Sequence, residues 1–150
     1  MKKDSNCEIR IRKALVSDAG AISRLNQAGL GYGLDIEGTT KRLEQVLPLS
    51  EEWTLVALVN GEIAGYIEGT TYECIYTEKL ADVLALAVDP EKRRLGVGEA
   101  LMQYVEDWAK EQGAVGVRLI SRSDRLGAHQ FYEACGYHKK DEYISFKKLF

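Results

Sequence analysis

The residues best suited to chemistry lie in one short segment, Arg93 to Met102. An apolar run, Val83 to Val88, precedes it and ends at Asp89-Pro90, and a helical pattern of apolar residues follows. The first N–H groups of a helix have no partner inside the helix and, with the helix dipole, attract anions. Gly96 and Gly98 let a ligand approach the backbone, and the two arginines add positive charge. The segment is therefore predicted to bind a phosphate group.

The spacing within this segment separates it from two common nucleotide-binding loops. It lacks the Lys-Ser/Thr ending of the P-loop and the third glycine of the dinucleotide fingerprint. What remains is Arg-x-x-Gly-x-Gly after a strand that ends in Val-Asp-Pro. This pattern resembles the pyrophosphate loop of the Gcn5-related N-acetyltransferase (GNAT) family. The resemblance implies that the loop holds the pyrophosphate of acetyl-coenzyme A (acetyl-CoA).

A second segment, Ala128 to Tyr137, resembles the same family through its Ala-x-x-Phe-Tyr-x-x-x-Gly-Tyr pattern. Ser123-Asp124 is suited to cap a helix here, and Gly136 is suited to end it. By spacing alone, Tyr132 is typical of a half-buried helix tyrosine. The resemblance implies instead that its hydroxyl protonates the departing coenzyme A thiolate. The reference pKa of a tyrosine is about 10, so it is a weak acid, but the thiolate has a similar basicity.

The elements that position these residues follow from hydrophobic periodicity and turn signals. Strands are predicted at Ile9–Arg12, Trp53–Val59, Ile63–Thr71, Val83–Val88, Val115–Leu119, Tyr137–His138 and Tyr143–Leu149, and helices after Ser17-Asp18, at Glu37–Leu47 and at Gly96–Gln112. Asn60-Gly61 is a strong hairpin signal. The resemblance covers nearly the whole chain. It implies the α/β (α+β) acyl-CoA N-acyltransferase fold, a mixed six- to seven-stranded sheet with helices on both faces, in a single N-acetyltransferase domain over residues 1–150.

Composition limits the alternatives. A chain of 150 residues that is 45% hydrophobic has enough apolar surface for one compact domain. It has no apolar stretch near 18 residues and no signal-type N-terminus, which predicts a soluble cytoplasmic protein without a membrane partner. A formal charge of −3 argues against a nucleic acid partner. Cys7, Cys74 and Cys135 share no metal-ligand spacing, so no metal is expected.

The resemblance also implies which residues contact the co-substrate. The fourth strand should splay from the fifth at a bulge, and the pantetheine arm should lie beside it, paired with backbone groups of Leu86 and Val88. A backbone N–H in this strand would polarise the thioester carbonyl. Arg125 occupies a position where many members carry asparagine, and it is expected to reach the pantetheine or a phosphate. The expected contacts are Leu86, Ala87, Val88, Arg93, Arg94, Leu95, Gly96, Val97, Gly98, Glu99, Ala100 and Arg125.

The general base has several candidates. Asp82 precedes Val88 by six residues, which matches the position of the catalytic glutamate in histone-acetylating members of the family. Glu68 or Glu73, on or after the third strand, is an alternative, and so is a water molecule. Asp82 is equally typical of a solvated carboxylate at the start of a strand. The predicted catalytic pair is therefore Tyr132 and Asp82, with the base left open between these candidates.

The resemblance also implies an acceptor cleft that is walled by the first two helices, their connection and the third-strand region. The residues there that could receive an ammonium group are Tyr32, Asp35, Glu37, Tyr66, Tyr72, Glu73 and Tyr76. The resemblance thus implies transfer of an acetyl group from acetyl-CoA to a primary amine of a small molecule or peptide. Two alternatives stay open: a non-catalytic CoA-binding regulatory domain, and a module that binds another phosphate ligand. The acceptor itself, acyl chains other than acetyl, and the choice between monomer and homodimer are not predicted.

Overall fold

The computed structural model describes residues 7–150. They form two compact units, one ending at Leu119 and one running from Ile120 to Phe150. The first unit holds a five-stranded sheet in the order β1-β2-β3-β4-β5. The strands are β1 Ile9–Lys13, β2 Glu52–Val59, β3 Glu62–Tyr72, β4 Leu80–Val88 and β5 Val117–Leu119. The first four pair antiparallel and β5 joins β4 in parallel, which confirms the expected mixed sheet.

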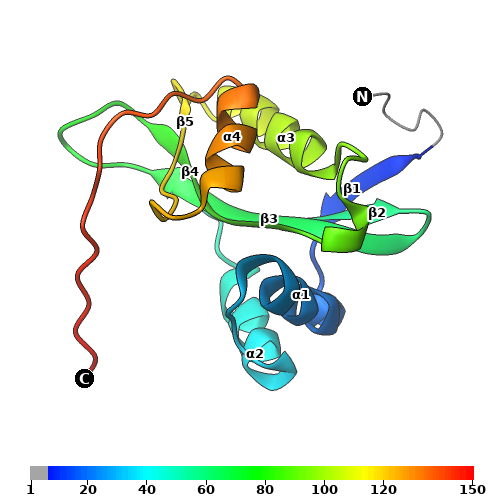
Figure 1. Cartoon of the computed structure of the whole chain (residues 1–150). Helices are drawn as coiled ribbons and strands as arrows, with labels where there is room; N and C mark the ends of the chain where they lie inside the picture. The colour runs from blue at the N-terminus through cyan, green and yellow to red at the C-terminus, as the bar shows by residue number, and fades with distance from the viewer. Residues whose placement is uncertain (1–6) are drawn as a thin grey trace. The chain divides into compact units, whose positions relative to one another are not determined.

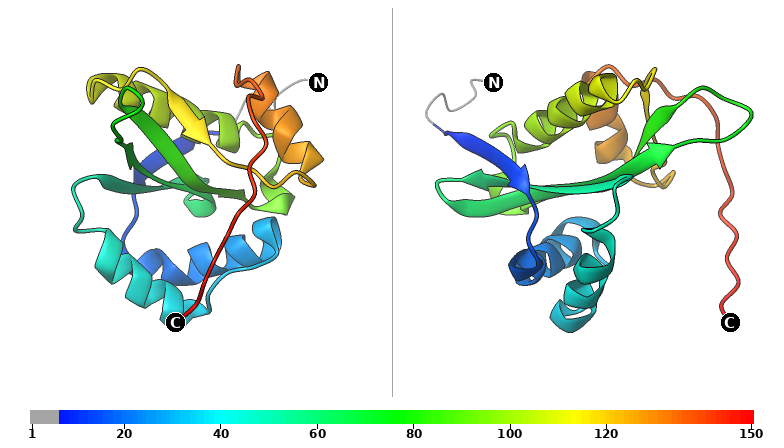
Figure 2. Two further views of the ribbon diagram at one scale, coloured as in Figure 1. Left: turned by 90° about the vertical axis from the view of Figure 1, so that its left-hand side faces the viewer. Right: turned by 180° about the vertical axis from the view of Figure 1, so that it is seen from behind.

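Helices of the first unit cover both faces of this sheet, as expected. The helices α1 (Ala19–Leu25) and α2 (Ile36–Val46) lie on one face, and α3 (Val97–Glu111) lies on the other (Figures 1 and 2). Short helical turns connect the elements: 3₁₀ turns η1 (Val16–Asp18) and η3 (Pro90–Lys92), and the π-helical turn η2 (Asn26–Leu30). None of the helices within residues 7–150 is both long and apolar enough to span a membrane.

Local signals explain where these elements begin and turn. Asn60 and Gly61 both have positive φ, 52° and 81°, as a two-residue type I′ hairpin requires. The side chain of Asp35 caps α2 by accepting the backbone N–H of Gly38 at 2.7 Å. The predicted hairpin and the second predicted helix are therefore confirmed.

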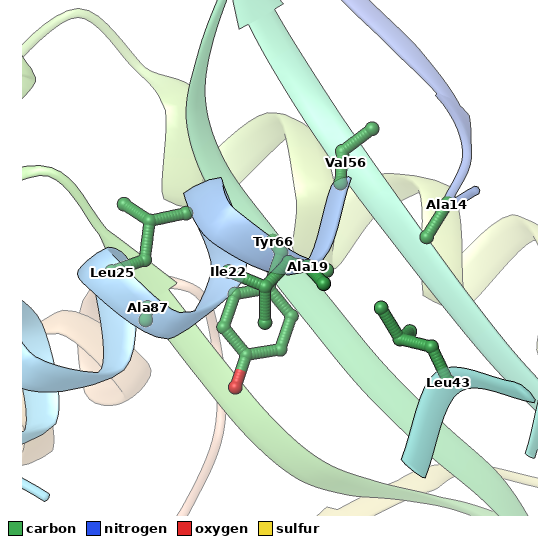
Figure 3. Packing of buried hydrophobic residues seen from close by; sticks show 8 residues of the cluster. All are labelled: Ala14, Ala19, Ile22, Leu25, Leu43, Val56, Tyr66 and Ala87. Atoms are coloured by element: carbon green, nitrogen blue, oxygen red, sulfur yellow. The ribbon is translucent and has the colours of Figure 1, made fainter. Parts of the chain in front are cut away.

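The core lies on both faces of the sheet. On the side of α1 and α2, Ile22 and Leu25 pack against Val56, Tyr66 and Ala87 of the sheet (Figure 3). Burying side chains of this size contributes about 1.5–3 kcal/mol each. These contacts hold α1 over β3 and β4, where the predicted acceptor cleft lies.

On the other face, α3 packs through Leu101 and Val105, and the ring of Trp108 lies 5.4 Å from that of Trp53. Two glycines of β3 leave room for the side chains that pack on this face of the sheet. A Cβ at Gly69 would lie 2.0 Å from the Trp53 ring, and one at Gly65 would lie 2.9 Å from the Val97 side chain. The first turn of α3 is thus held directly against the middle of the sheet.

Two bulges decide which side chains share a face of the sheet. In β3, Ala64 is the extra residue where the pairing with β2 shifts, and in β4 Leu84 is the extra residue opposite Glu68 and Gly69. A bulge reverses the face of the residues beyond it relative to a regular ladder. As a result, Thr54 of β2 pairs with Glu68, and both face α1 and α2.

The predicted strand count is wrong at the C-terminal end. The segments Tyr137–His138 and Tyr143–Leu149 form no strand, so residues 7–150 contain five strands and not six or seven. The apolar residues of the second segment are exposed, 82% for Ile144 and 90% for Phe146. Alternating β-forming residues make a strand only when a neighbouring strand satisfies their backbone groups, and here none does.

Candidate active site

The predicted phosphate loop forms a tight turn directly between β4 and α3. Asp89 accepts the backbone N–H of Glu91 at 3.0 Å and starts the turn, and Arg94 and Gly96 have positive φ of 66° and 87°. The first helical hydrogen bond runs from the Ala100 N–H to the Gly96 carbonyl, at 3.0 Å. Amides before Ala100 therefore have no acceptor within the helix, and amides of this kind at a helix N-terminus are suited to bind an anion.

Charge around the loop is also favourable for an anion. The side chains of Arg93 and Arg94 are exposed beside the first turn of α3. Lys92 forms an ion pair with Glu62 at 2.8 Å, which ties the loop to β3. The loop is thus anchored to the sheet, and its positive charge lies beside the N-terminus of α3. The positive φ of Arg94 is uncommon for a residue with a side chain, and such backbone positions concentrate at ligand sites.

The second half of β4 has an open edge. β5 pairs with β4 from Ala81 to Val83, and no strand within residues 7–150 continues along Leu84–Val88 on that side. The Asp89 N–H bonds to the Ala64 carbonyl in β3, at 2.8 Å. Since successive residues of a strand direct their N–H groups to opposite sides, those of Leu86 and Val88 point to the open edge. The bulge at Leu84 follows Val83, the last residue of β4 that pairs with β5, and the family resemblance implied a bulge at such a point.

A cavity of about 260 Å³ lies between α1, α2 and the sheet. Its polar lining comes from the end of α1, from α2, and from β2 and β3, and consists of Asn26, Thr39, Arg42, Glu52, Thr54, Tyr66 and Glu68. Leu84, the bulged residue of β4, also lines it. The cavity therefore reaches from the helices to the part of β4 where the open edge begins.

Glu68 of β3 is one of the two carboxylates that line this cavity, the other being Glu52. It is half-buried, and burial raises its pKa, with a further upward contribution from the charge of Glu52. Arg42 acts in the opposite direction. The carboxylate has no hydrogen bond or ion pair with any residue of the described range 7–150. A half-buried carboxylate with a raised pKa and no partner is suited to accept a proton from a substrate.

Tyr66, two residues before Glu68 on β3, has a hydrogen-bonded hydroxyl that stays neutral. Its hydroxyl donates a hydrogen bond to Asn26 Oδ1, which lies in the π-helical turn η2. Burial, reinforced by the charge of Glu68, raises the pKa of Tyr66 to about 12. The phenol is thus neutral at ordinary pH and fixes the end of α1 over the cavity. Single π-helical turns of this kind are frequent at functional sites.

Asp82, the predicted base, forms an ion pair with Arg118. Its Oδ2 lies 3.0 Å from Arg118 Nη1 of β5, and the guanidinium of Arg118 lies 4.2 Å from the centre of the Tyr72 ring. Burial raises the pKa of Asp82, and Arg118 lowers it. Asp82 does not line the cavity that contains Glu68. Its carboxylate fastens β5 to β4.

Of the residues predicted to receive the acceptor, Tyr66 lines the cavity. Asp35 caps α2, and Glu37 pairs with Lys41 on its surface. Tyr32 and Tyr76 are 56% and 77% exposed. Tyr72 packs under Arg118, as described above, and Glu73 lies 3.9 Å from Lys79.

Several cavity residues were not among the predicted ones. Glu52 and Thr54 alternate with Trp53 and Leu55, a pattern that predicts a strand with one polar end. Asn26 and Arg42 carry no signal of their own in the sequence. They enter the cavity because the π-helical turn and α2 bring them over β3.

A wider hollow of about 620 Å³ lies at β1 and the β2–β3 turn. Its charged side chains are already paired, Arg10 with Glu8 at 3.2 Å and Arg12 with Asp18 at 2.7 Å. These pairs leave it without the unpaired acid or base that the first cavity has.

The second unit contains the helix α4 (Leu126–Ala134), which carries Tyr132. It begins after the predicted cap, because Asp124 pairs with Arg122 at 2.8 Å and does not cap the helix; Arg125 is the residue before its first turn. Gly136, with φ of 92°, ends it as predicted. The Tyr132 ring contacts those of Phe131 and Tyr137 edge-on. Burial raises the pKa of Tyr132, and the charge of Arg125 lowers it.

Comparison with known proteins agrees with this geometry. The model of the acetyltransferase (GNAT) family matches residues 29–137. An uncharacterized N-acetyltransferase of Bacillus subtilis, YhfO, is 29% identical over 142 residues, 92% of this chain and 95% of the relative. An aminoglycoside N(6')-acetyltransferase type 1 of Acinetobacter genomosp. 13 is 30% identical over 105 residues, 69% of this chain and 68% of the relative.

A solved structure extends the likeness to the fold. The aminoglycoside acetyltransferase AAC(6')-Iy, in complex with a bisubstrate analogue of CoA and acetylneamine, aligns with a TM-score of 0.82 at 15% identity, over 95% of this chain and 99% of that one. At this identity the likeness concerns the fold. The match to the family model over residues 29–137 identifies this chain as a member of the GNAT acetyltransferase family.

Proposed function

We propose that this protein transfers the acetyl group of acetyl-CoA to a primary amine of a small polar molecule. The observation that carries the proposal is the end of β4. There an open strand edge with outward N–H groups runs directly into the glycine turn and the N-terminus of α3. An extended chain that ends in a pyrophosphate fits this order of donors, because a strand edge binds extended chains and a helix N-terminus binds phosphates.

The residues that hold the co-substrate follow from this fit. Leu86 and Val88 offer backbone groups to the pantetheine arm, and the turn from Arg93 to Ala100 offers amides and positive charge to the pyrophosphate. Arg125, before α4, remains proposed as a further contact. When bound, acetyl-CoA supplies an activated thioester. An N–H of β4 polarises its carbonyl.

Glu68, rather than Asp82, is the proposed base. Its carboxylate is unpaired within residues 7–150 and faces the cavity next to β4, whereas Asp82 is held by Arg118. Glu68 removes a proton from the acceptor ammonium, directly or through water, and Tyr132 gives a proton to the departing thiolate. Each of these transfers is worth about 10²–10⁴-fold in rate.

The cavity and the relatives support a proposal for the acceptor class. Two carboxylates, Glu52 and Glu68, face one cation, Arg42, so the cavity favours a cationic molecule. Several relatives carry the name of aminoglycoside acetyltransferases. We therefore propose amino sugars and other small amines as acceptors. A screen of aminoglycosides, alkylamines and peptides for thiol release from acetyl-CoA tests this, and activity confined to peptides would contradict it.

Replacing Gly96 by valine is expected to raise the dissociation constant for acetyl-CoA at least tenfold, about 1.4 kcal/mol. A β-branched side chain at φ of 87° deforms the turn and blocks the approach of the pyrophosphate. Isothermal calorimetry measures the effect. Gly113→Val is the matched control, because Gly113 has a similar φ of 77° at the other end of α3, with open space around its Cβ position. Unchanged affinity in Gly96→Val would remove the loop from the site.

A further inference from the structure

The cavity beside β4 contains a second carboxylate, that of Glu52, whose position relative to Glu68 is fixed by the sheet. Glu52 opens β2 and pairs with Thr70, while Thr54 pairs with Glu68. The two glutamates are therefore diagonal neighbours on the same face of two adjacent strands. Such neighbours have Cα atoms about 7–8 Å apart, which is within reach of one small molecule.

Neither glutamate has a protein cation bound to it. Within residues 7–150, no hydrogen bond or ion pair joins the carboxylate of Glu52 or Glu68 to another side chain. Other inward-facing carboxylates of the first unit do have an arginine: Asp18 accepts two hydrogen bonds from Arg12, and Asp82 pairs with Arg118. A partly buried charge without a partner is costly. Two such charges in one cavity indicate a ligand that brings the missing cations.

The rest of the lining agrees with a cationic ligand. Arg42 is the cation at the cavity, and its Nη1 donates a hydrogen bond to Gln45 rather than to either glutamate. Tyr66 is neutral, and Thr39 and Thr54 offer uncharged hydroxyls. With both glutamates ionised, the lining of the cavity therefore has one negative charge more than Arg42 neutralises.

We propose that Glu52 and Glu68 select an acceptor with two ammonium groups, in which Glu52 holds one and Glu68 faces the amine that reacts. This inference rests on the proposed function, and it gives Glu52 a role in specificity rather than in the chemical step. The distance between the glutamates sets the distance between the two nitrogens. Acceptors with a single amine are then bound more weakly.

The test compares 1,5-diaminopentane with pentylamine, which has the same chain and one amine fewer, by kcat/KM in wild-type protein and in two variants. Wild type should prefer the diamine at least tenfold, because a hydrogen bond between charged groups contributes roughly 1.5–3 kcal/mol. Glu52→Gln should reduce that ratio at least tenfold, through KM for the diamine. Glu51→Gln is the control, since Glu51 is the exposed neighbour outside the cavity and should keep the wild-type ratio.

Three results would overturn the inference. One is a wild-type ratio near unity, and another is a Glu52→Gln protein with the wild-type ratio. The third is a wild-type preference for 5-aminopentanoate over 1,5-diaminopentane. That result would mean that Arg42 determines specificity by binding a carboxylate of the acceptor. If wild type acetylates no amine, the proposed function fails by itself. Calorimetric titration with 1,5-diaminopentane then still tests the site, and equal affinity in wild type and Glu52→Gln would refute it.

Discussion

Replacing Tyr132 by phenylalanine is expected to lower kcat about 10²–10⁴-fold, with little change in acetyl-CoA affinity. The substitution keeps the ring that contacts Phe131 and Tyr137 and removes the hydroxyl that we propose as the proton donor. Since burial raises the pKa of Tyr132, its phenol stays protonated at neutral pH, as a donor must. Rapid-mixing experiments under single-turnover conditions measure the chemical step.

Tyr143→Phe is the matched control for this experiment. Tyr143 belongs to the same unit and is 67% exposed, so the loss of its hydroxyl should leave kcat unchanged. A Tyr132→Phe protein with wild-type turnover, under conditions where chemistry limits the rate, would show that water protonates the thiolate. Tyr132 would then be a packing residue of α4.

Replacing Glu68 by glutamine should lower kcat/KM near neutral pH by a similar factor, about 10²–10⁴-fold. In wild type the carboxylate must be ionised, so kcat/KM should fall as the pH drops through the pKa of Glu68, which burial raises above its usual value. The variant should lose this acidic limb and recover part of its rate at high pH, where the amine is already neutral. Initial rates across the pH range, at low acceptor concentration, measure both effects.

The free energy of unfolding of Glu68→Gln, measured with urea, separates a catalytic loss from a folding defect. A raised folded-state pKa means that the unfolded chain releases the proton first, so this carboxylate lowers stability as the pH rises from its unfolded pKa to its folded one. Glu68→Gln should thus resist urea at neutral pH at least as well as wild type. Asp82→Asn should instead weaken the fold, because it breaks the ion pair with Arg118. A rate loss confined to Asp82→Asn would make Asp82 the base.

The sequence pattern did not separate Glu68 from Asp82 as the base, because the face of the sheet on which Glu68 lies depends on a bulge in β3. An uninterrupted hairpin around Asn60-Gly61 would place Glu68 opposite Trp53, on the face that α3 covers. The bulge at Ala64 shifts the pairing by one residue and places Glu68 opposite Thr54, in the cavity. A bulge of one residue depends on tertiary packing and leaves little trace in the sequence; beside this one, a Cβ at Gly65 would lie 2.9 Å from the Val97 side chain.

The turn between β4 and α3 was predictable because its determinants are local. The turn needs a residue that adopts positive φ at Gly96 and a helix that starts at Val97, and both follow from neighbouring residues. The C-terminal strands were not predictable in the same way. Ile144 and Phe146 have the right residue types, but a strand also needs a partner, which alternation does not encode.

Amine-dependent release of coenzyme A tests the central proposal most directly. Purified protein is mixed with acetyl-CoA and, in turn, an aminoglycoside, 1,5-diaminopentane and pentylamine, and the free thiol and the mass of the amine are followed in the same sample. The proposal predicts thiol release that requires the amine and matches the acetylated product mole for mole. Tight binding of acetyl-CoA in calorimetry with no amine-dependent release would contradict it, and would make this chain a CoA-binding domain without turnover.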